Sequence, residues 1–187
     1  DAAVTNELAP LKLEAASFHT RLVTLHENDW NEFGVESVSF EVKTNPNTAT
    51  GPIQKVASGG ELARITLALK VVLANAYAIP TVIFDEVDSG IGGAAAAAVG
   101  DRLSCLAKHS QILLVTHSPQ VAARGTTHFQ ISKNINETGN ITLVGELVGN
   151  ARIEEIARML SGAKITTEAR AAAVSLLDAN NRIGAAK

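Results

Sequence analysis

Three acidic residues follow directly after an apolar stretch of the chain. Residues 81–84 are apolar or β-branched, and Asp85, Glu86 and Asp88 come next, before several glycines. Carboxylates crowded at the end of a buried strand repel one another and lose hydration, which is costly unless a cation or a reacting proton compensates. The spacing therefore predicts a site for a divalent cation, and a strand end that is simply hydrated is the alternative.

A second group could bind a phosphate. Ser58, Gly59 and Gly60 precede a stretch in which apolar residues recur at helical spacing, and this predicts a helix that begins at Ser58. The first turn of a helix presents free backbone N–H groups and the positive end of the helix dipole, and both attract an anion. A helix start that binds nothing is the alternative.

A histidine follows the second long apolar stretch. His117 ends the segment 111–117, where its imidazole could donate a hydrogen bond to a ligand or could be satisfied within the fold. Open parallel sheets bind ligands at the carboxyl ends of their strands and at helix N-termini, and all three groups fall at such positions. Together they meet the needs of phosphoryl transfer to water. We expect Asp85 to hold Mg²⁺ through its water shell, Glu86 to polarise the attacking water, and His117 to hydrogen-bond the γ-phosphate.

The elements that must position these groups have the pattern of an α/β protein. The apolar stretches at 81–84 and 111–117 predict two parallel strands that are covered on both faces, because neither alternates with polar residues. An alanine-rich helix is predicted between them, over about 93–107. A short helix should follow Ser118 and its neighbouring proline and end at Gly125.

The sequence on either side of this unit predicts further elements. Residues 38–43 alternate apolar and polar side chains, which is typical of a half-buried strand. Residues 128–147 predict a β-hairpin with Asn134, Asn136 and Gly139 in its turn. Two helices are expected after the hairpin, over about 151–160 and 165–179.

The N-terminal residues have a different apolar spacing. They predict a helix from about Pro10, as its first residue, to about His26. The helix could be the end of a coiled coil or an ordinary helix packed on a core. The apolar residues that recur at alternating intervals of four and three are Val4, Leu8, Leu11, Ala15, Phe18, Leu22 and Leu25.

Composition sets limits on the class of protein. A chain of 187 residues is long enough for one domain with its own core. Its 16 Lys and Arg against 19 Asp and Glu argue against a large nucleic-acid footprint on this segment. The single Cys105 rules out a disulfide and a cysteine-based metal site, and it indicates a reducing, intracellular setting. No apolar run approaches the roughly 18 residues of a membrane span.

Three stretches resemble the motifs of an ABC-type ATPase head. “ASGGELARITLALK” is similar to the signature motif, “PTVIFDEVDSGIGG” to the Walker B strand with its D-loop, and “VTHSPQVAARG” to the switch histidine. The residues of these motifs most resemble those of the RecN family of bacterial DNA repair proteins, which are relatives of the structural-maintenance-of-chromosomes (SMC) ATPases. “IEEIARMLSG” at 153–162 adds to this resemblance, which covers about residues 35–180.

The resemblance implies a fold. It predicts the α/β C-terminal lobe of an ABC/SMC-type P-loop ATPase head, in which helices flank a parallel sheet. A coiled-coil stub or connecting helix is expected over residues 1–27, and the C-terminal half of the head over residues 28–187. A β-hairpin and two helices should complete the C-terminal end.

The resemblance also implies a role for each of the candidate site residues. In such heads two copies enclose two ATP molecules with Mg²⁺, and the signature motif of one copy contacts the γ-phosphate held by the other. The residues assigned to the partner's nucleotide are Ser58, Gly59, Gly60 and Glu61. Asp88 is assigned to the dimer interface, and Asp85, Glu86 and His117 to the nucleotide of their own head.

One motif of such heads is absent from the sequence. No G-x-x-x-x-G-K-[ST] phosphate loop occurs in the 187 residues, so we expect the chain to bind ATP poorly by itself. The family carries this Walker A loop in an N-terminal half, beyond a long coiled coil. The implied partners are therefore that half, a second head in a homodimer, and DNA through the full-length protein, with no membrane and a cytoplasmic location at the nucleoid. An SMC-type chromosome-structure ATPase and, less favoured, a transporter nucleotide-binding domain are the alternatives.

Overall fold

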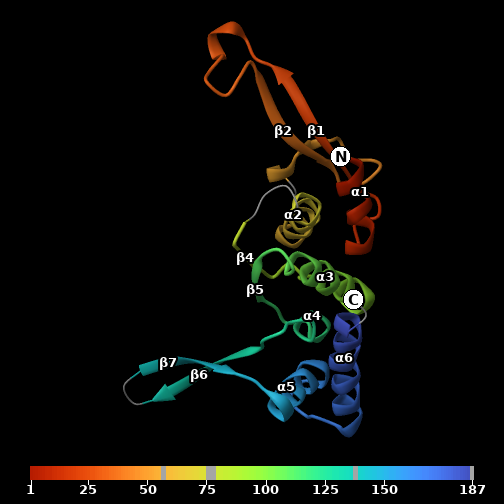
Figure 1. Cartoon of the computed structure of the whole chain (residues 1–187), viewed down its shortest axis with the longest axis vertical. Helices are drawn as coiled ribbons and strands as arrows, with labels where there is room; N and C mark the ends of the chain where they lie inside the picture. The colour runs from red at the N-terminus through yellow and green to blue at the C-terminus, as the bar shows by residue number, and fades with distance from the viewer. Residues whose placement is uncertain (56–57, 75–78, 137–138, 186–187) are drawn as a thin grey trace. The chain divides into compact units, whose positions relative to one another are not determined.

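The computed structural model describes residues 1–55, 58–74, 79–136 and 139–185 (Figure 1). These residues form two compact units, Asp1–Val115 and Thr116–Lys187. The predicted α/β character is confirmed, because helices accompany a parallel pair of strands in the first unit.

The parallel pair consists of β4 (Thr81–Asp85) and β5 (Gln111–Val115), joined through α3 (Gly93–Leu106). Thr81 pairs with Gln111 and Asp85 with Val115, so the two strands run in register over their whole length. Both predicted strands and the helix between them are confirmed. Asp85 therefore lies at the carboxyl end of a parallel strand, as the sequence indicates.

The described residues cover one face of this pair and leave the other exposed. Val82 is 7% exposed and Phe84 is also buried, whereas Ile83 is 69% exposed and Leu113 and Val115 are about half exposed. The expectation that both faces are covered is therefore wrong for this chain by itself. A strand made only of apolar residues has apolar side chains on both faces of its sheet. The described residues pack against one of these faces.

Helix α2 (Gly59–Leu73) packs between two other helices of the first unit. It contacts α3 on one side and the N-terminal helix α1 (Ala2–Leu8) on the other. The side chains that fill this core are fully buried and apolar, and they include Leu8, Leu11, Ile65, Leu67, Val87 and Val99. The core thereby fixes the start of α2 and the segment that follows β4 within the same unit.

The N-terminal helix predicted from about Pro10 to His26 is wrong. Helix α1 ends at Leu8, the single turn η1 (Ala9–Leu11) holds Pro10, and Lys12 takes a left-handed conformation with φ 61° that ends the helical segment. The next element is a strand, β1 (Ser17–Thr24). The expected coiled-coil stub is thus reduced to α1, whose Val4 and Leu8 are buried in the core.

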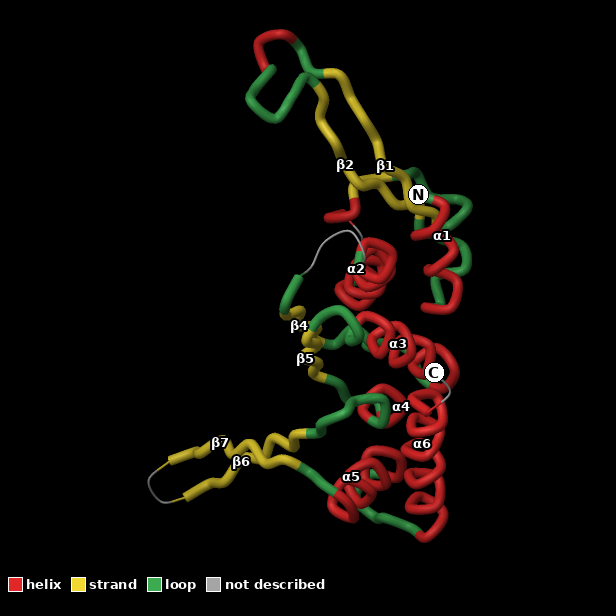
Figure 2. Tube along the Cα trace, in the orientation of Figure 1, coloured by secondary structure: helices red, strands yellow, loops and turns green. Residues whose placement is uncertain are grey.

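Strand β1 belongs to a second, antiparallel sheet. It forms a long hairpin with β2 (Glu36–Lys43), which contains the predicted strand at 38–43, and β3 (Gly51–Pro52) pairs with the end of β2 (Figure 2). Two short turns, η2 (Glu27–Asp29) and η3 (Ile53–Lys55), lie in the connecting loops. Phe18 is buried at the base of the hairpin, but the next cross-strand pair of apolar residues on that face, Leu22 and Val38, is exposed.

The second unit begins with α4 (Pro119–Ala122), which confirms the short helix after Ser118. The hairpin follows as β6 (Phe129–Asn136) and β7 (Gly139–Glu146), with Asn136 paired to Gly139. Asn134, Asn136 and Gly139 therefore lie in the strands rather than in the turn, and the two residues between the strands lie outside the described ranges.

Two helices complete the second unit, as expected. Helix α5 (Gly149–Ser161) packs on α6 (Thr167–Ala185) and on α4 (Figure 1). Small side chains let these helices approach closely, and the buried cluster comprises Ala122, Ala123, Ile156, Ala157, Ala169 and Ala173. Among the helices of the described ranges, none combines the length and the hydropathy that crossing a membrane requires.

Candidate functional site

The start of α2 has the geometry of a capped helix N-terminus. Ser58 is the N-cap, with extended backbone angles, and its hydroxyl accepts a hydrogen bond of 3.4 Å from the backbone N–H of Glu61. A glutamate at this third position also suits the positive end of the helix dipole. Ser58 and Gly59 are exposed, so the N–H groups of the first turn face a surface where an anion can reach them.

The segment after β4 turns sharply at Glu86. This residue takes a left-handed conformation, with φ 51°, which is uncommon for a residue other than glycine. Its backbone N–H donates to the carbonyl of Val115 at the end of β5 (3.3 Å), and its carbonyl accepts from the N–H of Ser89 (2.9 Å). The turn over residues 86–90, called the acidic turn below, is thus tied to both parallel strands.

The three carboxylates of this region have different surroundings. Asp85 and Glu86 are exposed, whereas Asp88 is 7% exposed and lies next to the fully buried Val87. Among the described residues, no group of three or more His, Cys, Asp or Glu side chains could hold a metal ion. The turn therefore buries Asp88 and leaves Asp85 and Glu86 exposed to water, and the assignment of Mg²⁺ to Asp85 alone stays a prediction.

The start of α2 and the acidic turn are in direct contact. The Nη1 of Arg64 on α2 donates a hydrogen bond of 3.0 Å to the carbonyl oxygen of Ser89. Gly60 lies against the same oxygen, since a Cβ built on Gly60 would be only 3.0 Å from it. The structure therefore brings two of the predicted motifs together, the segment 58–61 and the acidic turn.

Arg64 was not among the residues singled out from the sequence. Arg64 as a residue is 6% exposed, and burial lowers the pKa of its guanidinium, an effect that the nearby charge of Glu61 partly opposes. The available signal was a single cation placed four residues after Gly60, on a helix face that is otherwise apolar. A charged residue on the buried face of a helix indicates a specific polar partner.

His117 lies in the second unit, just before α4. It is exposed, and Ser118 after it is the N-cap of α4, although its hydroxyl bonds the side chain of Gln120 (3.0 Å) rather than the helix backbone. The backbone N–H of Ser118 donates to the hydroxyl of Thr116 (2.9 Å). The grouping of His117 with Asp85 and Glu86 remains a prediction.

A polar network supports the segment that follows α4. The guanidinium of Arg152 on α5 donates to the carbonyl oxygens of Gly125 (2.5 Å) and Ala123 (3.3 Å), and burial lowers its pKa. The same Nη2 also approaches the carbonyl of Ala122, at 3.5 Å. One arginine thus binds several carbonyls at the end of α4 and holds the residues after His117.

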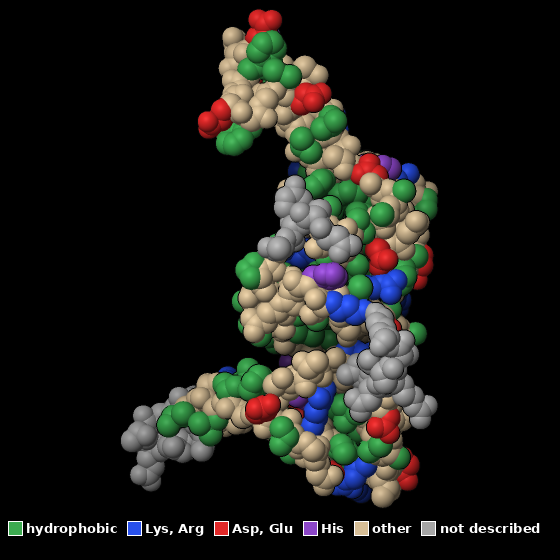
Figure 3. Space-filling view, viewed as in Figure 1, with side chains coloured by type: hydrophobic (Ala, Val, Ile, Leu, Met, Phe, Trp, Pro, Cys, Tyr) green, Lys and Arg blue, Asp and Glu red, His purple; other side chains and the backbone are tan. Residues whose placement is uncertain are grey.

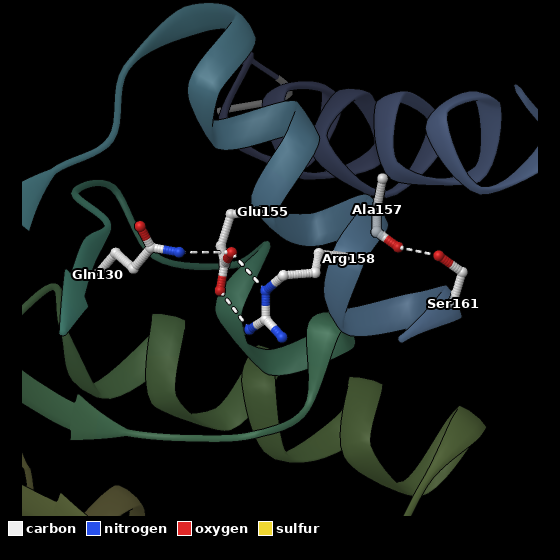
Figure 4. A network of polar contacts seen from close by, with 5 residues as sticks. All are labelled: Gln130, Glu155, Ala157, Arg158 and Ser161. Atoms are coloured by element: carbon white, nitrogen blue, oxygen red, sulfur yellow. Dashed lines mark hydrogen bonds and ion pairs between the residues drawn. The ribbon is translucent and has the colours of Figure 1, made fainter. Parts of the chain in front are cut away.

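A carboxylate on α5 connects this helix to the hairpin. Glu155 accepts two hydrogen bonds from Arg158, at 2.8 and 2.7 Å, and one from Gln130 on β6, at 2.7 Å (Figure 4). The bonds from Arg158 lower the pKa of Glu155, although burial opposes them. Burial, followed by the charge of Arg152, lowers the pKa of His128, and the charge of Glu155 partly opposes this shift.

The sequence of the chain is similar to that of known proteins. No family model matches the chain. It is 47% identical over 153 residues to the DNA repair protein RecN of Xylella fastidiosa (strain Temecula1), across 81% of this chain and 28% of that protein. It is 40% identical over 179 residues to RecN of Halalkalibacterium halodurans, across 94% and 31% respectively.

Solved structures match this chain at the level of the fold. The Smc head domain of Pyrococcus yayanosii, solved with a coiled coil and joint, matches 86% of this chain and 29% of its own, with a TM-score of 0.62 and 19% identity. An Smc head domain of Pyrococcus furiosus matches 84% of this chain and 37% of its own, with a TM-score of 0.55 and 22% identity. This chain is RecN-like in sequence and has the fold of part of an SMC head domain. It spans less than a third of the length of the RecN proteins named above.

Proposed function

We propose that this RecN-like chain is the C-terminal half of an ATP-hydrolysing head in a DNA double-strand-break repair and recombination protein. Two such heads would dimerise around ATP and thereby regulate the binding or tethering of DNA, at the nucleoid of the cell. The observation that carries the proposal is the contact between the capped start of α2 and the acidic turn after β4. The similarity to proteins named as DNA repair proteins supports the biological setting.

The residues after β4 suit the chemistry of hydrolysis. Asp85 is an exposed carboxylate at the carboxyl end of a parallel strand, and oxygen ligands of this kind are those that Mg²⁺ prefers. Mg²⁺, when bound, neutralises charge on the phosphates. A single carboxylate suffices when the ion keeps its waters, which agrees with the absence of a larger ligand cluster among the described residues.

Glu86 is the proposed base of the reaction. Its carboxylate is exposed, one residue beyond Asp85, and the left-handed backbone turns it away from the line of the strand. In this role it accepts a proton from the water whose oxygen attacks the γ-phosphorus, and ADP leaves as the bond to the terminal phosphate breaks. His117 is proposed to donate a hydrogen bond to the γ-phosphate.

The start of α2 is proposed to serve the nucleotide of the second head. Ser58 and Gly59 are exposed, so the N–H groups of this turn can meet a phosphate across an interface, with Glu61 beside them. Asp88 is already buried within the chain. We therefore assign the surface contact of the acidic turn to the exposed Ser89 and Gly90, with Asp88 fixed behind them.

An N-terminal half that carries the Walker A loop is the first partner required. The sequence contains no such loop, and the β4–β5 pair leaves an apolar face uncovered at Ile83, Leu113 and Val115. Apolar side chains are also exposed on the β1–β2 hairpin (Figure 3). Phe33, in the loop that connects the two strands, is 91% exposed. Exposed apolar patches of this kind mark protein interfaces, and we assign the face of β4–β5 to the N-terminal half of the same head.

The test is ATP turnover by the completed head, meaning this chain together with its N-terminal half. Glu86→Gln should abolish turnover while ATP-dependent dimers persist, because the amide cannot take up the proton but occupies the same space. Glu36→Gln is the matched control, since Glu36 is also exposed but lies on β2. Normal turnover by Glu86→Gln would refute the role given to Glu86.

The fold favours one alternative, a chromosome-structure ATPase of the SMC type. In that case ATP hydrolysis would be incidental to tethering. DNA compaction that is insensitive to Glu86→Gln would support this alternative, whereas loss of ATP-controlled DNA binding in that variant supports the repair head.

A further inference from the structure

We propose that Arg64 is a positioning residue that makes the start of α2 and the acidic turn move as one body. The inference rests on the proposed function in one respect, the assignment of these two segments to two different nucleotides. Under that assignment, Arg64 makes the activity of Glu86 on one nucleotide depend on contact between Ser58–Gly60 and the other nucleotide.

The first argument is geometric. Gly60 and Arg64 lie one turn apart on the same face of α2, and both meet the carbonyl oxygen of Ser89. Arg64 reaches it through a hydrogen bond of 3.0 Å. Gly60 brings the helix backbone so close that a Cβ would lie 3.0 Å from this oxygen and 3.3 Å from Nη1 of Arg64. Helix and turn therefore meet at Ser89, where the carbonyl oxygen faces both Gly60 and Arg64.

The second argument concerns the cost of burying a guanidinium. Arg64 is almost fully buried, its Nε makes no hydrogen bond to the described residues, and burial lowers its pKa. An apolar side chain at this position would continue the buried face next to Ile65 without that cost, and replacing buried charges by apolar residues is often stabilising. The stability of the fold thus does not explain why a cation occupies this position. The hydrogen bond to the carbonyl of Ser89 does explain it.

The third argument follows the contact into the acidic turn. The carbonyl of Ser89 accepts from Arg64, and the N–H of the same residue donates to the carbonyl of Glu86 at 2.9 Å. Val87 and Asp88 between them are buried and cannot move freely. If the start of α2 moves, Ser89 should therefore move with it, and the backbone at Glu86 should shift in turn.

The kinetic test uses Arg64→Met in the completed head. Methionine retains most of the aliphatic volume but removes the donors, and loss of a charge-assisted hydrogen bond that orients Glu86 should lower kcat about tenfold or more. KM for ATP and ATP-dependent dimerisation should stay nearly unchanged, because Ser58 and Gly59 are intact. Arg64→Lys should restore part of kcat. The matched control is Lys70→Met, which removes a cation from the same helix, outside this contact.

A second measurement requires no ATP. Hydrogen exchange on this chain should show faster exchange at the amides of Ser89 and Ile91 in Arg64→Met, because both close the acidic turn through bonds to Glu86 and Asp88. The amides of β4 and β5 should keep their protection, and Lys70→Met should leave the turn unchanged. If Arg64→Met does not fold, Gly60→Ala gives the same exchange readout, since its Cβ pushes against the Ser89 carbonyl.

The outcomes separate the two proposals. Equal turnover and equal exchange in Arg64→Met and Lys70→Met would overturn the role of Arg64. A completed head that does not hydrolyse ATP at all would refute the proposed function, and the exchange measurement would still decide whether Arg64 holds the acidic turn. Loss of turnover that Arg64→Lys does not restore at all, together with lost protection throughout β4 and β5, would mean that Arg64 only stabilises the fold.

Discussion

Replacing Ile83 by aspartate should leave this chain folded but prevent its assembly with the N-terminal half. The side chain of Ile83 is 69% exposed, so the carboxylate can remain in water, and the folded chain loses only a partly buried side chain and some strand propensity. We expect the free energy of unfolding to fall by about 1 kcal/mol. A change of this size leaves a cooperatively melting protein.

The effect on association should be much larger. Covering the exposed two-thirds of an isoleucine is worth about 1–2 kcal/mol, and burying an unpaired carboxylate in its place costs at least as much again. The affinity for the N-terminal half should therefore weaken by about 3 kcal/mol, which is roughly a hundredfold. Thermal melting of the chain and calorimetric titration with the N-terminal half measure the two effects separately.

The matched control is Val82→Asp, one residue earlier on the same strand. Val82 is 7% exposed, so its aspartate would be buried in the core of the chain, and this variant should fail to fold even without a partner. An Ile83→Asp chain that is unfolded, or that binds the N-terminal half as tightly as the unmodified chain, would refute the assignment of this face.

Two further predictions concern the α2 start and the second unit. Ser58→Arg should block dimerisation of the completed head without weakening ATP binding, since the bulky cation occupies the place of the partner's phosphate; equal loss of ATP binding, measured by titration, would count against a role across the interface. Burial and the charge of Arg152 lower the pKa of His128 below its ordinary value of 6.5, so the fold favours the neutral imidazole. The stability that this provides is fully present above pH 6.5 and should be lost as the pH falls from 6.5 through the lowered pKa. Urea unfolding should show a smaller loss of stability over that interval in His128→Gln, and an identical pH dependence in the two proteins would contradict the burial of the imidazole.

Local signals explain what the sequence could predict. The start of α2 at Ser58, with Glu61 three residues later, depends on capping chemistry between near neighbours, and the structure has both. The parallel strands were recognisable because an unbroken apolar run such as that of β4 is costly anywhere except inside a sheet. The exposure of one face of these strands could not be predicted, because the sequence of a single chain does not show whether another chain packs on that face.

Non-local pairing explains what the sequence did not predict. Phe18 and Leu22 are four residues apart, and this spacing places two side chains on one face of a helix and equally on one face of a strand. The partner that decides for the strand is β2, where Phe18 pairs with Val42. The role of Arg64 likewise depends on Ser89, 25 residues further along the chain, which no local pattern indicates.

The most direct test of the central claim is a structure of the completed Glu86→Gln head dimer with Mg²⁺ and ATP. The account predicts that the side chain at position 86 lies within hydrogen-bond distance of a water placed for attack on the γ-phosphorus. It also predicts that Ser58 and Gly59 contact the γ-phosphate held by the other head. A structure in which position 86 is remote from the γ-phosphorus, or in which the α2 start faces away from the second nucleotide, would contradict it.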